Sequence, residues 1–149
     1  MRLSRCIVAA VLALAGAGAC RRIPRGLEVE RHSGAVVAGQ LVEDIGIETL
    51  GGVFTPLLAR GRQVPCDVTE TFGTAADNQD NVQIRLFRGV AGLARDATPL
   101  GRFTIDNLPK RPRGEVVVAV TFAFTADGTL VIRASERSGH AVSLRRSDG

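Results

Sequence analysis

Few side chains in this sequence of 149 residues have the types and spacing that catalysis requires. A cysteine nucleophile needs a histidine beside it, and the sequence offers only His32 and His140 as partners for Cys66. The run D-N-Q-D-N at 77–81 lacks the glycine and the distal glutamate of a calcium loop. The motifs G-x-S-x-G and H-E-x-x-H and a paired-cysteine motif are all missing. We therefore expect neither an enzyme nor a metal site.

The chemistry that the sequence does offer is apolar contact and main-chain hydrogen bonding. Residues 44–58, D-I-G-I-E-T-L-G-G-V-F-T-P-L-L, place two apolar runs around a Gly-Gly pair, which is typical of two strands joined by a very tight connection. Leu50 lies at the rim of that connection, where it has little core to enter. Residues 72–84, F-G-T-A-A-D-N-Q-D-N-V-Q-I, again place small residues at a turn before an apolar strand. We expect these two loops to face each other across a groove.

Strand signals dominate the rest of the chain that must position these loops. The strongest is at 116–124, where Val and Phe alternate with smaller residues over nine positions. Ala126-Asp127-Gly128 predicts a hairpin turn, and two prolines make 107–114 a loop. Strands are expected near residues 45–48, 53–58, 67–72, 82–87, 100–105, 116–124, 130–135 and 141–144. About eight short strands and no helical period after the leader predict one all-β domain, an antiparallel β-sandwich at 41–146 with a tail at 147–149.

The charge distribution argues against a nucleic-acid partner. The net charge is +4, but from residue 41 onward 13 basic residues balance 13 acidic ones. The excess lies in the leader and in Arg21, Arg22, Arg25 and Arg31. Phosphate binding needs a clustered positive face on the folded part, and base stacking needs aromatic platforms in a sequence without Trp or Tyr. We expect no nucleic acid to bind.

Residues 1–19 have the pattern of a secretory signal peptide. Arg2 and Arg5 precede an apolar run at 7–19 that ends in small residues. The run is shorter than the roughly 20 residues that a spanning helix needs. The alternative, a buried helix of a globular domain, does not explain the two arginines or the position at the start of the sequence. We expect the protein to be exported to the cell envelope or periplasm.

The end of this leader leaves two processing routes open. A-G-A-C at 17–20 resembles the lipobox of bacterial lipoproteins, in which Cys20 would carry lipid and anchor the protein to the membrane. Ala17 stands where the lipobox usually has leucine, and Ala17 with Ala19 also suits an ordinary signal peptidase. Without lipidation, a Cys20 to Cys66 disulfide is conceivable. Residues 20–40, rich in Arg, Gly and Ala, are interpreted as a flexible basic tether.

Four motifs in order resemble the β-sandwich substrate-binding subdomain of the Hsp70 heat-shock chaperones. These are I-G-I-E-T-L-G-G-V-F-T-P-L at 45–57, F-G-T-A-A-D-N-Q at 72–79, L-G-R-F-T-I at 100–105, and P-R-G followed by V-T-F-A-F-T-A-D-G-T-L-V-I-R-A within 112–134. The likeness runs from about residue 44 to residue 146. It implies the same fold and the binding of extended apolar peptides of unfolded proteins.

The resemblance also implies roles for individual residues. Leu50 and Ala75 would form an arch over the peptide, and Gly73, Thr74 and Ala75 would bond its main chain. A central pocket would be lined by Ile47, Thr49, Val53, Phe72, Val82, Ile84 and Val118. The pattern alone favours a plainer role for Phe72, Ile84 and Val118, because an alternating apolar stripe usually forms the sandwich core.

The sequence departs from the Hsp70 pattern at several points. No nucleotide-binding domain or phosphate-binding motif precedes the sandwich and no helical lid follows it, so no cofactor is expected. Arg113 matches a position that faces the lid in the family. A-V-V-A-G at 35–39 replaces the leucine-rich linker, and R-G-V at 88–90 replaces the usual Q-G-E.

The sequence thus predicts an ATP-independent, holdase-like module that binds extended apolar segments, with its oligomeric state undetermined. The alternative is a structural or interaction lipoprotein of the envelope whose groove is vestigial or is filled by the protein's own tail. In that case Val36, Val37 and Leu41 would lie in the groove as a pseudo-substrate. A third alternative is a gene fragment to which a leader became attached.

Overall fold

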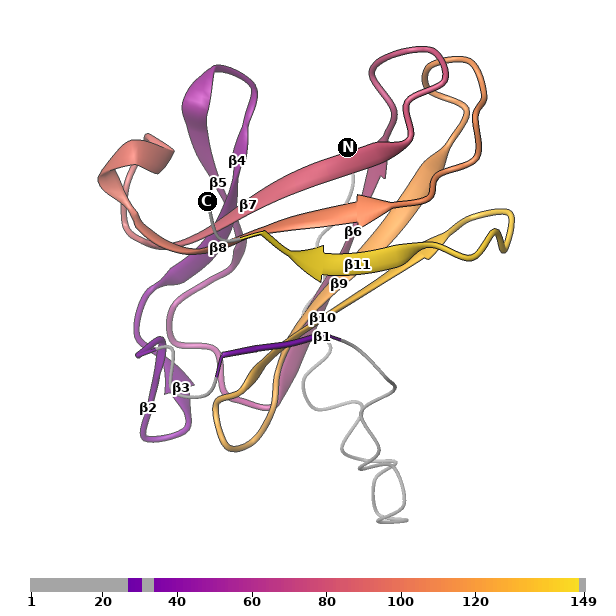
Figure 1. Cartoon of the computed structure of the whole chain (residues 1–149). Coiled ribbons are helices and arrows are strands. Elements are labelled where there is room, and N and C mark those ends of the chain that lie inside the picture. The colour runs from indigo at the N-terminus through magenta and orange to yellow at the C-terminus, as the bar shows by residue number, and fades with distance from the viewer. Residues whose placement is uncertain (1–26, 31–33, 148–149) are drawn as a thin grey trace, which may run out of the picture.

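Alternating apolar residues build two antiparallel sheets in the computed structural model, which describes residues 27–30 and 34–147 (Figure 1). The strands are β1 (Leu27–Glu30), β2 (Val36–Val37), β3 (Gln40–Leu41), β4 (Asp44–Thr49), β5 (Val53–Leu58), β6 (Cys66–Gly73), β7 (Asn81–Gly89), β8 (Thr98–Asp106), β9 (Val117–Phe124), β10 (Leu130–Glu136) and β11 (Ser143–Arg146). Two short 3-10 turns, η2 (Leu50–Gly52) and η3 (Ala94–Asp96), lie between strands. Each of the eight strands expected from the sequence is present.

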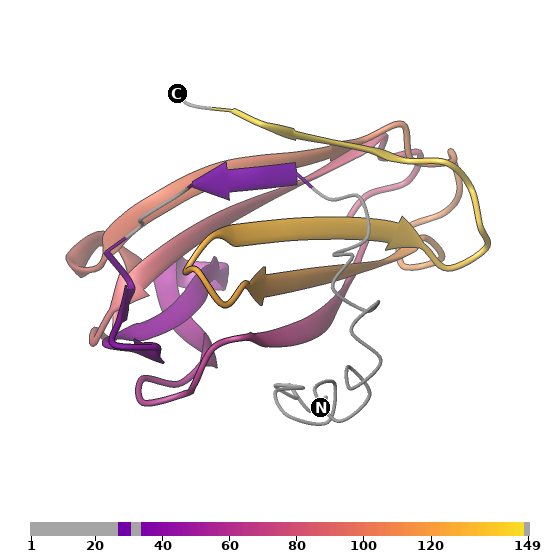
Figure 2. The same ribbon diagram turned by 90° about the horizontal axis from the view of Figure 1, so that it is seen from below.

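The two main sheets form the layers of a sandwich. One has the order β1-β10-β9-β6 and the other the order β11-β8-β7-β4-β5, and β2 and β3 form a separate small ribbon. Every pairing is antiparallel. In Figure 2, β1, β10 and β9 lie side by side in one layer. The all-β antiparallel sandwich predicted from the sequence is confirmed.

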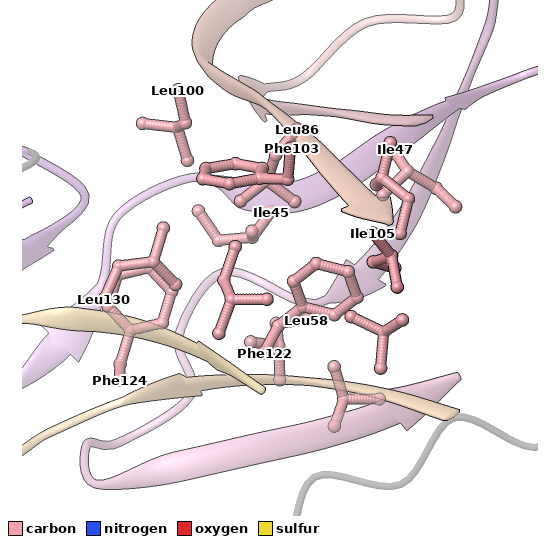
Figure 3. Close-up of a cluster of buried hydrophobic side chains, with 14 of the residues drawn as sticks. Ile45, Ile47, Leu58, Leu86, Leu100, Phe103, Ile105, Phe122, Phe124 and Leu130 are labelled. Atoms are coloured by element: carbon pink, nitrogen blue, oxygen red, sulfur yellow. The ribbon is translucent and has the colours of Figure 1, made fainter. Parts of the chain in front are cut away.

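The core lies between the inner faces of the two sheets. Ile45, Leu86 and Phe103 from one sheet point toward Phe122 and Leu130 from the other (Figure 3). All five side chains have no exposed surface. In β9, buried Val118, Val120, Phe122 and Phe124 alternate with half-buried residues, as the period of two predicts.

A second, smaller cluster covers the outer face of the five-stranded sheet. Phe54 of β5 and Phe87 of β7 pack there against Ala94 of η3. The connection between β7 and β8 also bonds to the edge of β5, where the N–H of Phe54 donates to the carbonyl oxygen of Gly92 at 3.1 Å. This connection therefore supports the hairpin that β4 and β5 form.

The tether predicted at 20–40 contains strands in the part that the structure describes. β1 pairs with β10, with Leu27 opposite Ile132. The N–H of Leu41 donates to the carbonyl oxygen of Arg62 at 2.8 Å, and Ala35 is fully buried. The linker interpretation is therefore wrong for residues 27–30 and 34–40. It failed because two-residue strands are too short to show a period, and main-chain bonds to the turn at 60–65 hold them.

The ribbon of β2 and β3 also contradicts the pseudo-substrate alternative for its residues. Val36 lies against Gly128 in the β9–β10 turn, with its Cβ 3.4 Å from the place that a Cβ at Gly128 would take. In Figure 1 this ribbon lies at the bottom of the view, whereas the β4–β5 hairpin rises to the top. Val36, Val37 and Leu41 therefore lie at the end of the sandwich opposite to the expected groove.

The leader and Cys20 lie outside the described residues, so the processing predictions stay predictions. Within 27–30 and 34–147, no helix has the length and apolar character needed to span a bilayer.

Candidate functional site

The β4–β5 hairpin presents Leu50 to solvent. Gly51 and Gly52 have φ angles of 82° and 75°, which only glycine adopts without strain, so they permit the tight connection. The Thr49 hydroxyl donates a hydrogen bond to the carbonyl oxygen of Val53 at 3.3 Å. It also forms a hydrogen bond with the Thr55 hydroxyl at 2.9 Å. Leu50 is 97% exposed. The hairpin tip is thus a fixed turn that carries an apolar side chain outward, as the sequence predicts.

The β6–β7 loop is held by a side chain that sequence reasoning did not single out. The Oε1 atom of Gln79 accepts hydrogen bonds from the N–H groups of Ala75 at 2.9 Å and Ala76 at 3.2 Å. Its Nε2 atom donates to the carbonyl oxygen of Asn81 at 2.6 Å. Gln79 therefore sets the conformation of the loop on which Ala75 is exposed. The sequence shows a glutamine four residues after Ala75, which by itself does not reveal this role.

The connection between β8 and β9 braces the same loop from the side. The N–H of Gly114 donates to both the carbonyl and the hydroxyl oxygen of Thr74 at 2.9 Å. The N–H of Arg113 donates to Oδ1 of Asp77 at 3.0 Å. Arg113, whose role the sequence left in doubt, therefore contributes its main chain to the support of this loop.

The main-chain groups at 73–75 differ in whether they already form hydrogen bonds within the protein. The N–H of Thr74 donates to the carbonyl oxygen of Val116 at 3.2 Å, and its carbonyl accepts from Gly114. Because the bonding direction alternates along a strand, the main-chain groups of Gly73, the last residue of β6, point the other way, toward the free edge. The N–H of Ala75, beyond the end of the strand, donates to Oε1 of Gln79. Both main-chain groups of Thr74 are thus engaged within the protein, whereas those of Gly73 face the open edge. The main-chain bonds to a peptide expected at 73–75 stay a prediction.

The two loops project from one end of the sandwich. Figure 1 shows the β4–β5 hairpin and the β6–β7 loop rising on opposite sides of the upper end of the molecule. The ladder between β4 and β7 ends at the pair Ile47 and Leu86. Beyond it, an ion pair between Arg85 and Glu48 joins the two strands. The hairpin therefore leaves the sheet as a separate projection with a charged contact at its base.

The residues expected to line the central pocket separate by burial. Ile47, Val82, Ile84 and Val118 are 6%, 9%, 4% and 0% exposed and belong to the main core. Phe72 is half-buried against that core and lies opposite Val118 in the β6–β9 ladder. The core role favoured for Ile84 and Val118 is confirmed, and Phe72 packs against that core. The pocket role of all five residues stays a prediction.

The rim of the expected groove is exposed. Thr49 and Val53 lie there with Leu50, and Val53 is 43% exposed. An isolated bridge joins Val53 to Leu93 of the β7–β8 connection. Leu93 is a support that sequence reasoning missed, because nothing in a loop pattern indicates which strand edge the loop will cover.

Side chains suited to catalysis do not gather within the described residues. Cys66 is buried in the core at 3% exposure, whereas His140 is exposed in the β10–β11 connection. No group of three or more His, Cys, Asp or Glu side chains in this part of the chain could hold a metal ion. The site consists of apolar side chains and main-chain groups.

Comparison with known proteins assigns the same region to one family. A sequence model of the family described as Hsp70 protein matches residues 34–145, which is most of the chain. The chain belongs to the Hsp70 family. The resemblance seen in the four sequence motifs is thereby confirmed, and the match covers β2 to β11 apart from the last residue of β11.

Several chaperone proteins named dnaK are similar to this Hsp70-family chain. The one from Cyanidioschyzon merolae is 44% identical over 94 residues, or 63% of this chain and 16% of that protein. The one from Cyanidium caldarium is 39% identical over 114 residues, or 70% of this chain and 18% of that protein. DnaK from Methanothermobacter thermautotrophicus is 40% identical over 112 residues, or 69% of this chain and 19% of that protein. The chain thus spans less than a fifth of the length of these relatives.

Proposed function

We propose that this Hsp70-family domain binds extended apolar segments of unfolded proteins between the β4–β5 hairpin and the β6–β7 loop, and that this binding needs no nucleotide. The observation that carries the proposal is Leu50, which is 97% exposed on a hairpin whose turn is fixed by two glycines. A peptide that covers this large apolar side chain removes it from water, which lowers the free energy.

The main chain of the peptide supplies the second part of the binding. Gly73, the last residue of β6, directs its amide and carbonyl groups to the open edge of that strand, where an extended segment adds as a strand does. Such main-chain bonds do not depend on the side chains of the peptide. A module built this way accepts many clients, provided that they are extended and apolar.

One apolar side chain of the client would enter between the loops, above the buried end of the core. Ile47, Val82 and Ile84 form that end, and Phe72 is half-buried beside it. Aliphatic walls favour Leu or Ile, and full burial of such a side chain contributes roughly 1.5 to 3 kcal/mol. All residues of this proposal lie within 47–118, and no phosphate-binding group takes part in it.

Fluorescence anisotropy of a labelled Leu-rich heptapeptide with the mature protein tests the proposal. We expect saturable binding that is equal with and without ATP. Val82→Phe, which adds volume at the end of the core below the loops, should weaken the binding, and circular dichroism shows whether this variant folds. A peptide with every Leu changed to Asp serves as the control. Absence of binding by the folded native protein, or equal binding of the control peptide, refutes the function.

We also propose that the protein is exported and anchored by lipid at Cys20. The support is the leader at 1–19 and the lipobox-like A-G-A-C at 17–20. Labelling of expressing bacteria with palmitate should mark the native protein and not the Cys20→Ser variant. Equal labelling of both, or a native protein found only in the soluble fraction, contradicts the anchor.

A further inference from the structure

The five-stranded sheet carries, at β7, β8 and β11, a hollow of about 390 Å³ that no residue of the expected groove lines. Three arginines, Arg85 of β7, Arg102 of β8 and Arg146 of β11, lie around it. Phe87, Pro99 and Leu100 supply apolar lining. The hollow therefore lies where arginines from three adjacent strands meet apolar residues.

Two of the arginines place like charges side by side. Arg85 and Arg102 are directly opposite each other in the β7–β8 ladder. Like charges in that position destabilise a sheet, so the pair carries a cost unless an anion lies between or beside them. Arg85 pairs with Glu48, but Arg102 makes no ion pair with any residue that the structure describes. A positive excess therefore remains at the hollow.

Asp106 does not neutralise Arg102, and Arg85 is already oriented. Asp106 on β8 is engaged by Arg145 through Nε at 2.5 Å. The guanidinium carbon of Arg85 lies 5.4 Å from the centre of the Phe87 ring, in the range of a cation–π contact. Glu48 and Phe87 thus fix Arg85 against the sheet. A guanidinium held in place loses less conformational freedom when it binds a carboxylate.

We propose that this hollow binds an acidic peptide segment of a partner protein, with a carboxylate at the arginines and an adjacent apolar side chain on Phe87, Pro99 and Leu100. A carboxylate matches the planar fork of arginine, and the apolar lining needs an apolar body beside it. Free phosphate would leave Pro99, the exposed member of that lining, uncovered. The site is separate from the groove loops and does not depend on the function proposed for them.

The probe is a fluorescein-labelled hexapeptide with the core Glu-Phe-Glu, compared with a matched peptide in which both Glu are Gln. We expect anisotropy to show binding of the acidic peptide and at least tenfold weaker binding of the neutral one, as expected when charge-assisted contacts are lost. Arg102→Gln should weaken binding of the acidic peptide about fivefold or more. Arg95→Gln, an exposed arginine of η3 outside the hollow, should leave it unchanged. Raising NaCl from about 50 to 500 mM should weaken binding, because salt screens exposed charges.

Two further measurements distinguish this site from the groove and from a site for free oxyanions. Leu50→Asp should not change the affinity for the acidic peptide, so loss of binding in that variant assigns it to the groove and overturns the proposal. Inorganic phosphate at the concentration of the peptide should not compete; full competition identifies a site for free oxyanions and also overturns it. Without peptide, Arg102→Gln should raise Tm by about 1–4 °C, because a like-charge pair is removed. An unchanged or lower Tm contradicts the charge argument.

Discussion

The role proposed for Leu50 depends on where the fold places this side chain. One exposed leucine is common on protein surfaces and is unremarkable by itself. Leu50 differs because two glycines with positive φ fix the turn beneath it, and Thr49 bonds across that turn to Val53 and Thr55. The side chain is therefore held outward beside the open end of the sandwich.

Leu50→Asp should weaken binding of a Leu-rich heptapeptide by roughly tenfold to a hundredfold, since covering a leucine contributes about 1.5 to 3 kcal/mol. Tm should stay within about 1 °C of the native value, because the residue is 97% exposed. The matched control is Val90→Asp, a second exposed aliphatic residue in the β7–β8 connection, which should keep the native affinity. Equal losses in both variants would mean that charge repels the peptide without a contact at Leu50.

Glu136 is a buried carboxylate whose charge the fold favours. Its Oε2 atom accepts hydrogen bonds from the hydroxyl of Ser138, from the N–H of Ser138 at 2.8 Å and from the N–H of His140 at 3.3 Å. The Ser138 hydroxyl is the main cause that lowers the pKa of Glu136 below its usual value. The ionised side chain therefore stabilises the connection that leads from β10 into β11.

Glu136→Gln should lower Tm at pH 7 and have little effect near pH 3. A carboxyl with a depressed pKa in the folded state contributes stability above its unfolded pKa of about 4.3. That contribution is lost as the pH falls through the lower folded value. Thermal unfolding of both proteins from pH 3 to pH 7 measures the difference. A gap in Tm that does not narrow on acidification would show that packing, and not ionisation, is responsible.

At the scale of elements, each groove loop has its own support. The β8–β9 connection bonds the β6–β7 loop through Gly114 and Arg113, and the β7–β8 connection bonds the β5 edge through Gly92. Within the β6–β7 loop, Oε1 of Gln79 accepts hydrogen bonds from the amides of Ala75 and Ala76. The loops are therefore preformed, which lowers the ordering cost of binding.

Gln79→Ala should weaken peptide binding about threefold to tenfold, since hydrogen bonds of this kind contribute about 0.5 to 1.5 kcal/mol each. Hydrogen exchange should also accelerate at the amides of Ala75 and Ala76, which lose their acceptor. Gln83→Ala on the exposed face of β7 is the control and should change neither quantity. Weaker binding with unaltered exchange at these amides would indicate direct contact between Gln79 and the peptide.

At the scale of the whole molecule, the β2–β3 ribbon and the groove loops occupy opposite ends. β2 and β3 bond to the turn at 60–65, and β1 extends the other sheet at β10. The loops of the groove rise from the far end (Figure 1). The ribbon of β2 and β3 thus lies away from the site, and β1 adds a strand to the other sheet.

Deletion of residues 21–33 and, separately, Val37→Asp should leave the affinity for the Leu-rich peptide unchanged. The deletion removes β1 from the β10 edge and should lower Tm by a few degrees, because strand pairing is lost. Val37 is 58% exposed, so its substitution should not affect Tm. Anisotropy and thermal unfolding report the two quantities. Higher affinity in either variant would show that the protein's own tail competes for the groove.

The fold class, the eight strands at 45–144 and the family could be predicted from the amino-acid sequence alone. Side-chain alternation and turn residues are local signals, and four motifs in order identify Hsp70 relatives. Leu50 at an exposed tip also follows from the Gly-Gly pair. Contacts between residues far apart in the sequence became visible only in the fold. They are the strand pairings within 27–41, the hydrogen bond from Gly114 to Thr74, and the pairing of Arg85 with Arg102. Hydrogen bonds and charges between distant residues depend on how the sheets pair, and no local pattern contains that register.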